Sequence, residues 1–324
     1  MLARHKPFFF IYFVFFNFIQ FAQGQEVLNT LNEIKKLIEK HYYRIDEIRE
    51  KWPDMIAKTR EKINHTASTD QQYQAIVELL DDFKHSHLSF SPPGKTLRSS
   101  LKKGRFLDYP ARKKTGKNDQ VGLLKLKENL KIEKRDDGIL YLAFNAFTFR
   151  QVGKIKQAIS ENRDSKGMIL DLRHNPGGAG MLACGIALEF CEKDYSLGTM
   201  TGPDLNLKFT VVAQGSYYKG PLMILINGRS FSTSEILARG MQVAGEATII
   251  GTPTLGLALP SVMIKLDDGS CFQYPVADFR DAQGKLLESS GVEPDHLIEV
   301  TKEDIERKYD AQLEKAVALI LAHQ

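Results

Sequence analysis

The chain has 324 residues, 43% of them hydrophobic and 26% charged, which is enough to bury a large core. Its formal net charge of +4 comes from interspersed acidic and basic residues, so no nucleic-acid partner is expected. This length favours one compact domain with a smaller domain attached to it.

Residues 1–24 have the pattern of an export signal. Two basic residues precede an apolar stretch at 7–21, and residues 22–24 (Ala-Gln-Gly) offer a small-residue cleavage site. The stretch is shorter than the ~20 residues that span a bilayer, and Asn17 and Gln20 interrupt it, which favours cleavage over a membrane anchor. We therefore expect an exported protein, in the periplasm, the cell envelope or secreted, that meets a membrane only if this segment is retained.

Residues 25–95 are predicted to form a small three-helix domain. Apolar residues recur at helical spacing from Val27 to Ile38, and Pro53 suits the first turn of a second helix. A third helix is expected to begin near Ser68, whose S-x-x-Q pattern is typical of a helix start.

An extended segment leaves this domain and carries His85-Ser86-His87. Its two imidazoles are expected to point to opposite sides. A metal site on both histidines lacks a further ligand at recognisable spacing, so a single general base on the inward side is the more economical interpretation. No metal or organic cofactor is expected, and the three cysteines fit neither a metal nor a disulfide framework: Cys184, Cys191 and Cys271.

Residues 96–324 are predicted to form an α/β core. The stretch 96–138 is basic, with weak strand alternation at 121–126 and 130–133. From residue 139 onward, strand and helix patterns alternate, which is typical of α/β proteins. The expected strands are 139–144, 167–173, 221–226, 247–251, 261–265 and 271–276, and the expected helices are 152–160, 181–191, 235–244 and about 304–323.

The segment Asp171-Leu-Arg-His-Asn-Pro-Gly-Gly178 follows a buried strand. Two adjacent glycines can point successive amides to one side, which makes an anion-binding concavity of the kind that acyl-transfer enzymes need for an oxyanion. Nucleotide binding is the alternative, because residues 178–183 fit G-x-G-x-x-A. However, no acidic residue closes a second strand about twenty residues later.

Phe231-Ser-Thr-Ser-Glu235 follows the buried strand 221–226 and an Asn-Gly turn, and opens a helix. Ser232 is the candidate nucleophile, because free amides and the positive end of a helix favour an oxyanion formed beside it. The same residues match the S-x-x-E capping box, in which the serine only caps the helix. On this stretch alone, capping is the commoner role.

Three motifs together resemble the C-terminal-processing (tail-specific) serine peptidases. They are Asp-Leu-Arg-x-Asn-x-Gly-Gly at 171–178, Asn-x-x-Ser-x-Ser-x-Ser-Glu at 227–235 and Gly-Val-x-Pro-Asp at 291–295. The resemblance covers most of the mature chain in the right order and favours Ser232 as a nucleophile over Ser232 as a cap. It implies a ClpP/crotonase-like core of ββα units and peptide bonds as the substrate.

The sequence departs from the better-known branch of that family, in which a lysine activates the serine. Leu257 occupies the place of the lysine, and Val243 stands where that branch usually has an aspartate. A Ser-Lys pair is therefore not expected, with Lys265 left open as a displaced substitute for the lysine. The other branch, typified by the tricorn core protease and including retinoid-binding relatives, uses histidine. It is matched by Ser86-His87 and by Glu288.

This branch implies a Ser-His-Glu arrangement. His87 is expected to take the proton from Ser232, and Glu288 to orient the imidazolium, with Ser86 supporting the network. The amides of Thr233 and of Gly178 or Gly177 are expected to bind the oxyanion. Rival residues remain open: Glu293 and Asp295 for the acid, and His174 for the base.

The sequence thus predicts an exported serine endopeptidase that acts on proteins or peptides. Residues 95–137 are short for a carboxylate-binding PDZ module, so none is expected. The alternative is a non-catalytic protein that binds an apolar ligand or a peptide on the same scaffold, to which Leu255, Leu257 and Leu259 give some support. The oligomeric state is left open.

Overall fold

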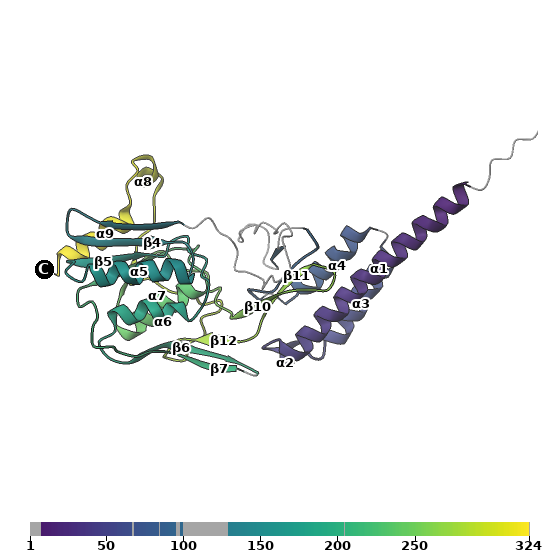
Figure 1. The fold of residues 1–324 in the computed structure, drawn as a ribbon, viewed down its shortest axis with the longest axis horizontal. Coiled ribbons are helices and arrows are strands. Elements are labelled where there is room, and N and C mark those ends of the chain that lie inside the picture. The colour runs from purple at the N-terminus through teal and green to yellow at the C-terminus, as the bar shows by residue number, and fades with distance from the viewer. Residues whose placement is uncertain are drawn as a thin grey trace, which may run out of the picture. The chain divides into compact units, whose positions relative to one another are not determined.

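The chain divides into two compact units, each described here by itself (Figure 1). Unit 1 comprises Met1–Val121 and Ser261–Val276, and unit 2 comprises Gly122–Pro260 and Ala277–Gln324. The expected strands at 261–276 therefore group with the helical residues, rather than with the rest of the α/β core. The computed structural model describes residues 8–66, 68–83, 85–94, 98–99, 129–203 and 205–323, so the expected strand at 121–126 lies outside the described residues.

Helices build most of unit 1. Its helices are α1 (Phe8–His41), α2 (Ile45–Ile48), α3 (Trp52–Asn64) and α4 (Thr69–Asp81). The predicted helical N-terminal region is confirmed, with the short α2 as an addition. The apolar faces of α1, α3 and α4 meet in one core that includes Leu31, Ile34, Trp52, Ile76 and Leu80.

A four-stranded antiparallel sheet completes unit 1, in the order β10-β11-β1-β2. The hairpin of β10 (Ser261–Lys265) and β11 (Cys271–Pro275) pairs with β1 (Ser89–Ser91), which in turn pairs with β2 (Arg98–Ser99). Asp268, in the hairpin turn, accepts hydrogen bonds from the hydroxyls of Thr30 at 2.6 Å and Tyr73 at 2.8 Å. The hairpin is thereby attached to helices α1 and α4, which explains why it belongs to this unit.

Unit 2 is built on a six-stranded sheet in the order β13-β9-β8-β5-β4-β3. All neighbours are parallel except the antiparallel pair β3–β4. This arrangement confirms the predicted α/β class. The strands are β3 (Leu130–Lys134), β4 (Ile139–Phe144), β5 (Gly167–Asp171), β8 (Leu222–Ile226), β9 (Thr248–Gly251) and β13 (His296–Leu297).

Helices cover both faces of this sheet, because the central strands are apolar on both sides (Figure 1). One face packs against α5 (Phe149–Glu161), α6 (Leu182–Ala187) and α7 (Thr233–Ala244). The other face packs against α9 (Ala311–Leu321), through Ala316, Val317 and Ile320. The helix expected at 181–191 is shorter than predicted, since Leu188–Phe190 (η1) form a 3₁₀ turn.

A three-stranded sheet lies beside this core, in the order β12-β6-β7. Its strands are β6 (Tyr195–Gly202), β7 (Leu205–Val211) and β12 (Asp278–Arg280). The single last helix expected at about 304–323 is wrong, because the chain forms α8 (Lys302–Glu306) and then α9. Lys308 adopts a positive φ of 51° between them, and the side chain of Asp310 caps α9.

Across the described part of the chain, no helix combines the length and the apolar character that a membrane crossing requires.

Candidate active site

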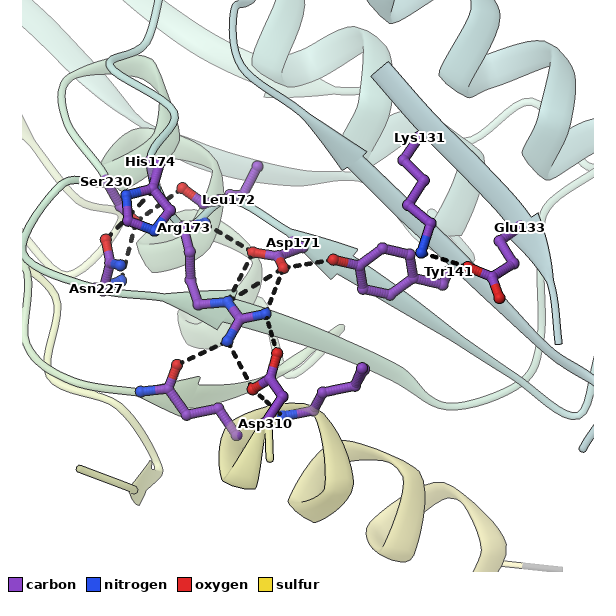
Figure 2. Close-up of polar contacts among 12 residues, drawn as sticks. Lys131, Glu133, Tyr141, Asp171, Leu172, Arg173, His174, Asn227, Ser230 and Asp310 are labelled. Atoms are coloured by element: carbon purple, nitrogen blue, oxygen red, sulfur yellow. Dashed lines mark hydrogen bonds and ion pairs between the residues drawn. The ribbon is translucent and has the colours of Figure 1, made fainter. Parts of the chain in front are cut away.

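The loops that follow β5 and β8 meet at one edge of the large sheet. The two strands are parallel neighbours, with Asp171 in register with Leu225, so both loops leave from the same end. The hydroxyl of Ser230 donates to the carbonyl oxygen of Leu172 at 2.9 Å and ties the two loops together (Figure 2). The glycine segment and the serine segment are therefore brought together, as their positions after parallel strands predict.

Ser232 sits at the entrance of α7 with φ 53° and ψ −117°, a backbone conformation that L-residues rarely adopt. Such a residue costs on the order of 1–3 kcal/mol and is concentrated at functional sites. A sharp strand-turn-helix connection of this kind exposes a serine hydroxyl at the end of a sheet. Ser232 is half-buried, so its side chain keeps partial access to solvent.

The predicted capping box is present at the start of α7, with Ser232 and Glu235 as its two partners. The N–H of Ser232 donates to Oε2 of Glu235 at 2.9 Å, which is the glutamate half of the box. The N–H of Glu235 in turn also donates to the main-chain carbonyl oxygen of Ser232 at 2.9 Å.

Asn175 joins the glycine loop to the serine loop. Its side chain is fully buried, accepts from the N–H of Gly177 at 2.9 Å and donates to the carbonyl oxygen of Phe144 at 2.9 Å. Its own carbonyl oxygen accepts from the N–H of Phe231 at 3.0 Å and the hydroxyl of Ser234 at 2.9 Å. Asn175 lies within the motif at 171–178, but the sequence pattern predicts no separate role for it.

Two backbone amides next to Ser232 are available as donors. Within the part of the chain that the structure describes, the N–H groups of Gly178 and Thr233 have no hydrogen-bond acceptor, whereas that of Gly177 is engaged by Asn175. Gly177 has φ 95°, and a Cβ atom there would lie 2.9 Å from Cβ of Ser232 and 3.0 Å from the nitrogen of Thr233. The glycine loop therefore lies directly against the serine turn.

Glu235 fastens the loop at 254–257 to the start of α7. The side chain is fully buried, and its oxygens accept from the hydroxyl of Thr254 at 2.5 Å and from the N–H groups of Gly256 at 2.8 Å and Leu257 at 3.0 Å. The carbonyl oxygen of Leu257 accepts from the N–H of Ser232 at 3.0 Å. Burial raises the pKa of Glu235 to about 7, and these hydrogen bonds oppose the rise.

The same loop holds Glu288. The Glu288 side chain is buried, and its Oε2 accepts from the N–H of Ala258 at 3.1 Å. Of its two rivals, Glu293 is exposed, while Asp295 accepts from the N–H of Ile249 at 2.7 Å and from Gln242 at 2.8 Å. Both rivals thus have surroundings that differ from those of Glu288. A partner of Glu288 is Ala258, the residue that follows Leu257, and the carbonyl oxygen of Leu257 contacts Ser232.

Ser86 and His87 belong to unit 1, just before β1. The hydroxyl of Ser86 is buried and lies 2.8 Å from Nδ1 of His87. When Nδ1 is the donor in this contact, Nε2 keeps its lone pair and can accept a proton. Burial lowers the pKa of His87 to about 4, which keeps the imidazole neutral at neutral pH. Lys265 lies on β10, also in unit 1 and exposed.

An ion-pair network lies behind the glycine loop (Figure 2). Arg173 binds Asp171 at 2.6 Å and Asp310 at 2.7 Å, and donates to Gln312 at 3.1 Å. Tyr141 donates to Asp171 at 2.6 Å. This network fixes the end of β5 to the first turn of α9.

His174, the rival base, lies exposed in the loop with φ 66°. Its backbone N–H donates to Oδ1 of Asn227 at 3.4 Å, and Figure 2 shows its imidazole ring beside Asn227 and Ser230. Partial desolvation by the surrounding loop and the nearby charge of Arg229 lower the pKa of its imidazole.

Serine hydrolases hold their nucleophile in a strained turn between a strand and a helix, and the turn at Ser232 has this form. Residues 138–298 match peptidase family S41. The chain therefore carries a domain of this family, as its motifs predict.

Curated relatives of the chain are named as carboxyl-terminal-processing proteases. The chain is 28% identical over 180 residues to a carboxyl-terminal-processing protease of Synechocystis sp. (strain ATCC 27184 / PCC 6803 / Kazusa), which covers 55% of this chain and 42% of that protein. It is 25% identical over 169 residues to the carboxy-terminal processing protease CtpA of Bacillus subtilis (strain 168), covering 52% and 36%. The chain thus spans less than half the length of these relatives.

Solved structures share the fold. The photosystem II D1 C-terminal processing protease has a TM-score of 0.58 at 17% identity, covering 86% of this chain and 95% of that chain. Mature CPAF has a TM-score of 0.66 at 12% identity, covering 94% and 99%. The tricorn protease has a TM-score of 0.64 at 16% identity, covering 92% of this chain and 37% of its own. At these identities the likeness concerns the fold alone.

Proposed function

We propose that this protein is an exported serine endopeptidase that cleaves peptide bonds of proteins or peptides with Ser232 as its nucleophile. The observation that carries this proposal is the rare backbone conformation of Ser232 at the entrance of α7, where the glycine loop lies directly against the serine turn and the amides of Gly178 and Thr233 follow on either side. Two such donors are suited to the oxyanion of a tetrahedral intermediate. Gly178 is favoured over Gly177 because Asn175 already accepts the Gly177 amide.

His87 is the proposed general base. Its Nε2 takes the proton of Ser232 as the hydroxyl oxygen attacks the scissile carbonyl, and then gives this proton to the leaving amine. Water hydrolyses the acyl-enzyme by the reverse sequence, which restores the serine. Ser86 supports this role, because a bond from Nδ1–H to its hydroxyl leaves Nε2 unprotonated.

Glu288 is the proposed acid that stabilises the imidazolium. A buried carboxylate favours the charged form of a neighbouring histidine, because it supplies an opposite charge at low dielectric. Its attachment to the loop of Leu257, whose carbonyl oxygen holds the Ser232 amide, supports the choice of Glu288 over the exposed Glu293. Leu257 is itself apolar and nearly buried, which argues against a lysine-type activation at that position.

Hydrolysis of a casein-like substrate tests this assignment. Ser232→Ala and His87→Ala are expected to lower kcat/KM by at least about 10³-fold, since each removes a member of the nucleophile-base pair. The matched controls Ser160→Ala and His65→Ala change exposed residues of the same types and should retain the parent activity. Equal rates of cleavage by the parent and by folded Ser232→Ala would disprove the assignment of Ser232. A folded parent that cleaves nothing would leave a non-catalytic binding protein as the better explanation.

Export is the second part of the proposal. It rests on the basic and apolar pattern of residues 1–24, with its small-residue end at Gly24. The mass of the protein recovered from its native cells should correspond to a chain that lacks this segment. A protein that retains Met1 in the cytoplasm would contradict it.

A further inference from the structure

Four polar residues form one stripe along α7. Ser232, Glu235, Arg239 and Gln242 recur at intervals of three or four residues, which places them on the same face of the helix. Each of the last three binds a segment from later in the chain. Glu235 holds the loop at 254–257, Arg239 holds Asp281, and Gln242 donates to Asp295. The stripe thus connects the serine turn with much of the C-terminal third of unit 2.

The pair of Arg239 and Asp281 is the most enclosed ion pair of this stripe. Nε of Arg239 lies 2.8 Å from Oδ2 of Asp281, and the two side chains are 20% and 1% exposed. The remaining guanidinium nitrogens donate to Gln242 at 2.9 Å and to Gln283 at 3.2 Å. Because an unpaired buried carboxylate is costly, the position of Asp281 depends on Arg239.

Asp281 in turn organises the hairpin that ends in Glu288. Its Oδ1 accepts from the N–H groups of Gln283 and Lys285, both at 2.9 Å, which closes the turn after β12. The returning strand pairs with β12, since the N–H of Leu287 donates to the carbonyl oxygen of Phe279 at 3.0 Å. Glu288 is the next residue, so its location follows from the attachment of the turn to α7.

We propose that Arg239, through its ion pair with Asp281, is a positioning residue that sets the place of the Glu288 carboxylate relative to Ser232. The inference rests on the proposed function, in which Glu288 stabilises the imidazolium of His87. The helix that carries the nucleophile at its first turn then also carries the support for the acid two turns later. The nucleophile and the acid are therefore both attached to α7, which holds their separation constant, as the precise positioning of catalytic groups requires.

A merely structural ion pair makes a different prediction. A residue that only stabilises unit 2 lowers the unfolding temperature, and its effect on kcat is independent of Glu288. A positioning residue loses its effect on kcat once the group that it positions is already disabled. Arg239 and Glu288 form no direct contact among those described, so coupling between them reports on the hairpin.

The test is a double-mutant cycle with Arg239→Met, Glu288→Gln and the double variant, measured as kcat and KM from pH 5 to 9. Arg239→Met is expected to lower kcat by about 10- to 100-fold with KM nearly unchanged. It should also move the acidic limb of the kcat profile to lower pH, as Glu288→Gln does, because the imidazolium loses stabilisation. In the Glu288→Gln background, Arg239→Met should lower kcat by less than about twofold.

Two further variants keep the test decisive. Arg239→Lys retains the charge without the three-way contact, so its kcat should lie between that of the parent and that of Arg239→Met. If the methionine variant does not fold, the cycle is carried out with Arg239→Lys in its place. Arg135→Met removes an ion pair whose arginine is similarly exposed and whose carboxylate, Asp137, is more exposed than Asp281. This pair lies in the turn between β3 and β4, and its loss should leave both kcat and the pH profile unchanged.

The outcomes separate the two proposals. If the parent cleaves the substrate but the losses of Arg239→Met and Glu288→Gln multiply in the double variant, the positioning role is disproved and the peptidase assignment stands. An unchanged acidic limb of the kcat profile in Arg239→Met would likewise disprove the positioning role and leave the peptidase assignment in place. If the parent itself is inactive, both proposals fall together.

Discussion

At the scale of single residues, the site depends on a few buried polar groups around the strained Ser232. Glu235 has the largest part, because it accepts from the N–H of Ser232 and from three donors of the loop at 254–257. Burial disfavours its charged form, whereas the four donors favour it. The result is a carboxyl group that titrates near neutral pH in the folded protein.

This titration predicts that the contribution of Glu235 to the free energy of unfolding depends on pH. The folded-state pKa of Glu235, about 7, is above the usual value of 4.5, so its contribution to stability is fully present below pH 4.5 and is lost as pH rises through 7. Relative to Glu235→Gln, the parent should lose about 3 kcal/mol of unfolding free energy between pH 4.5 and pH 8. Urea denaturation at several pH values measures this difference, and parallel pH curves for the two proteins would contradict it.

Sequence patterns predict some of these residues and miss others. The S-x-x-E spacing identifies Ser232 and Glu235 as partners across one helical turn, but it describes the glutamate as a cap only. The contacts of Glu235 with residues 254–257, and of Asn175 with Phe231, join segments that are far apart in sequence. No local period or motif encodes such contacts, so they become visible only in the folded chain.

At the scale of elements, helix α9 is attached to the loop that precedes the glycine pair. Arg173 lies between Asp171, at the end of β5, and Asp310, which caps α9. The Asp171 side chain is 8% exposed and that of Arg173 14%, so the pair is largely shielded from solvent. Removing one member of a buried pair leaves an uncompensated charge.

Arg173→Met is therefore expected to destabilise unit 2 by about 3–5 kcal/mol, because it leaves Asp171 buried without its partner. The control is Arg307→Met, which removes an exposed pair with Glu303 and should change stability by less than about 0.5 kcal/mol. Chemical denaturation followed by circular dichroism measures both variants. Equal midpoints for the parent and Arg173→Met would show that the network contributes little.

Most of the central elements follow from periodicity. The buried runs of β5 and β8 and the amphipathic pattern of α7 are clear in the sequence, and the structure confirms them. β6 and β7 are absent from the prediction, although Leu205, Leu207, Phe209 and Val211 alternate with polar residues as a half-buried strand should. The break between α8 and α9 was not predictable from apolar spacing, because Lys308 adopts its left-handed conformation without a glycine.

At the scale of the whole molecule, the proposed mechanism draws on both units. Ser232, Glu288 and the amides of Gly178 and Thr233 belong to unit 2, whereas Ser86 and His87 belong to unit 1. The hairpin of β10 and β11 leaves the core and pairs with β1, two residues after His87. The chain between Ser232 and Glu288 therefore passes through the unit that carries the proposed base, a connection that the family motifs do not reveal.

The most direct measurement is active-site labelling with a fluorophosphonate, followed by peptide mapping. This reagent phosphonylates a serine only where a base activates the hydroxyl and amides accept the developing charge. The account predicts one covalent adduct on Ser232 in the parent, greatly slowed labelling in His87→Ala and none in Ser232→Ala. A folded parent that gains no mass, or one labelled at another serine, would contradict the central claim.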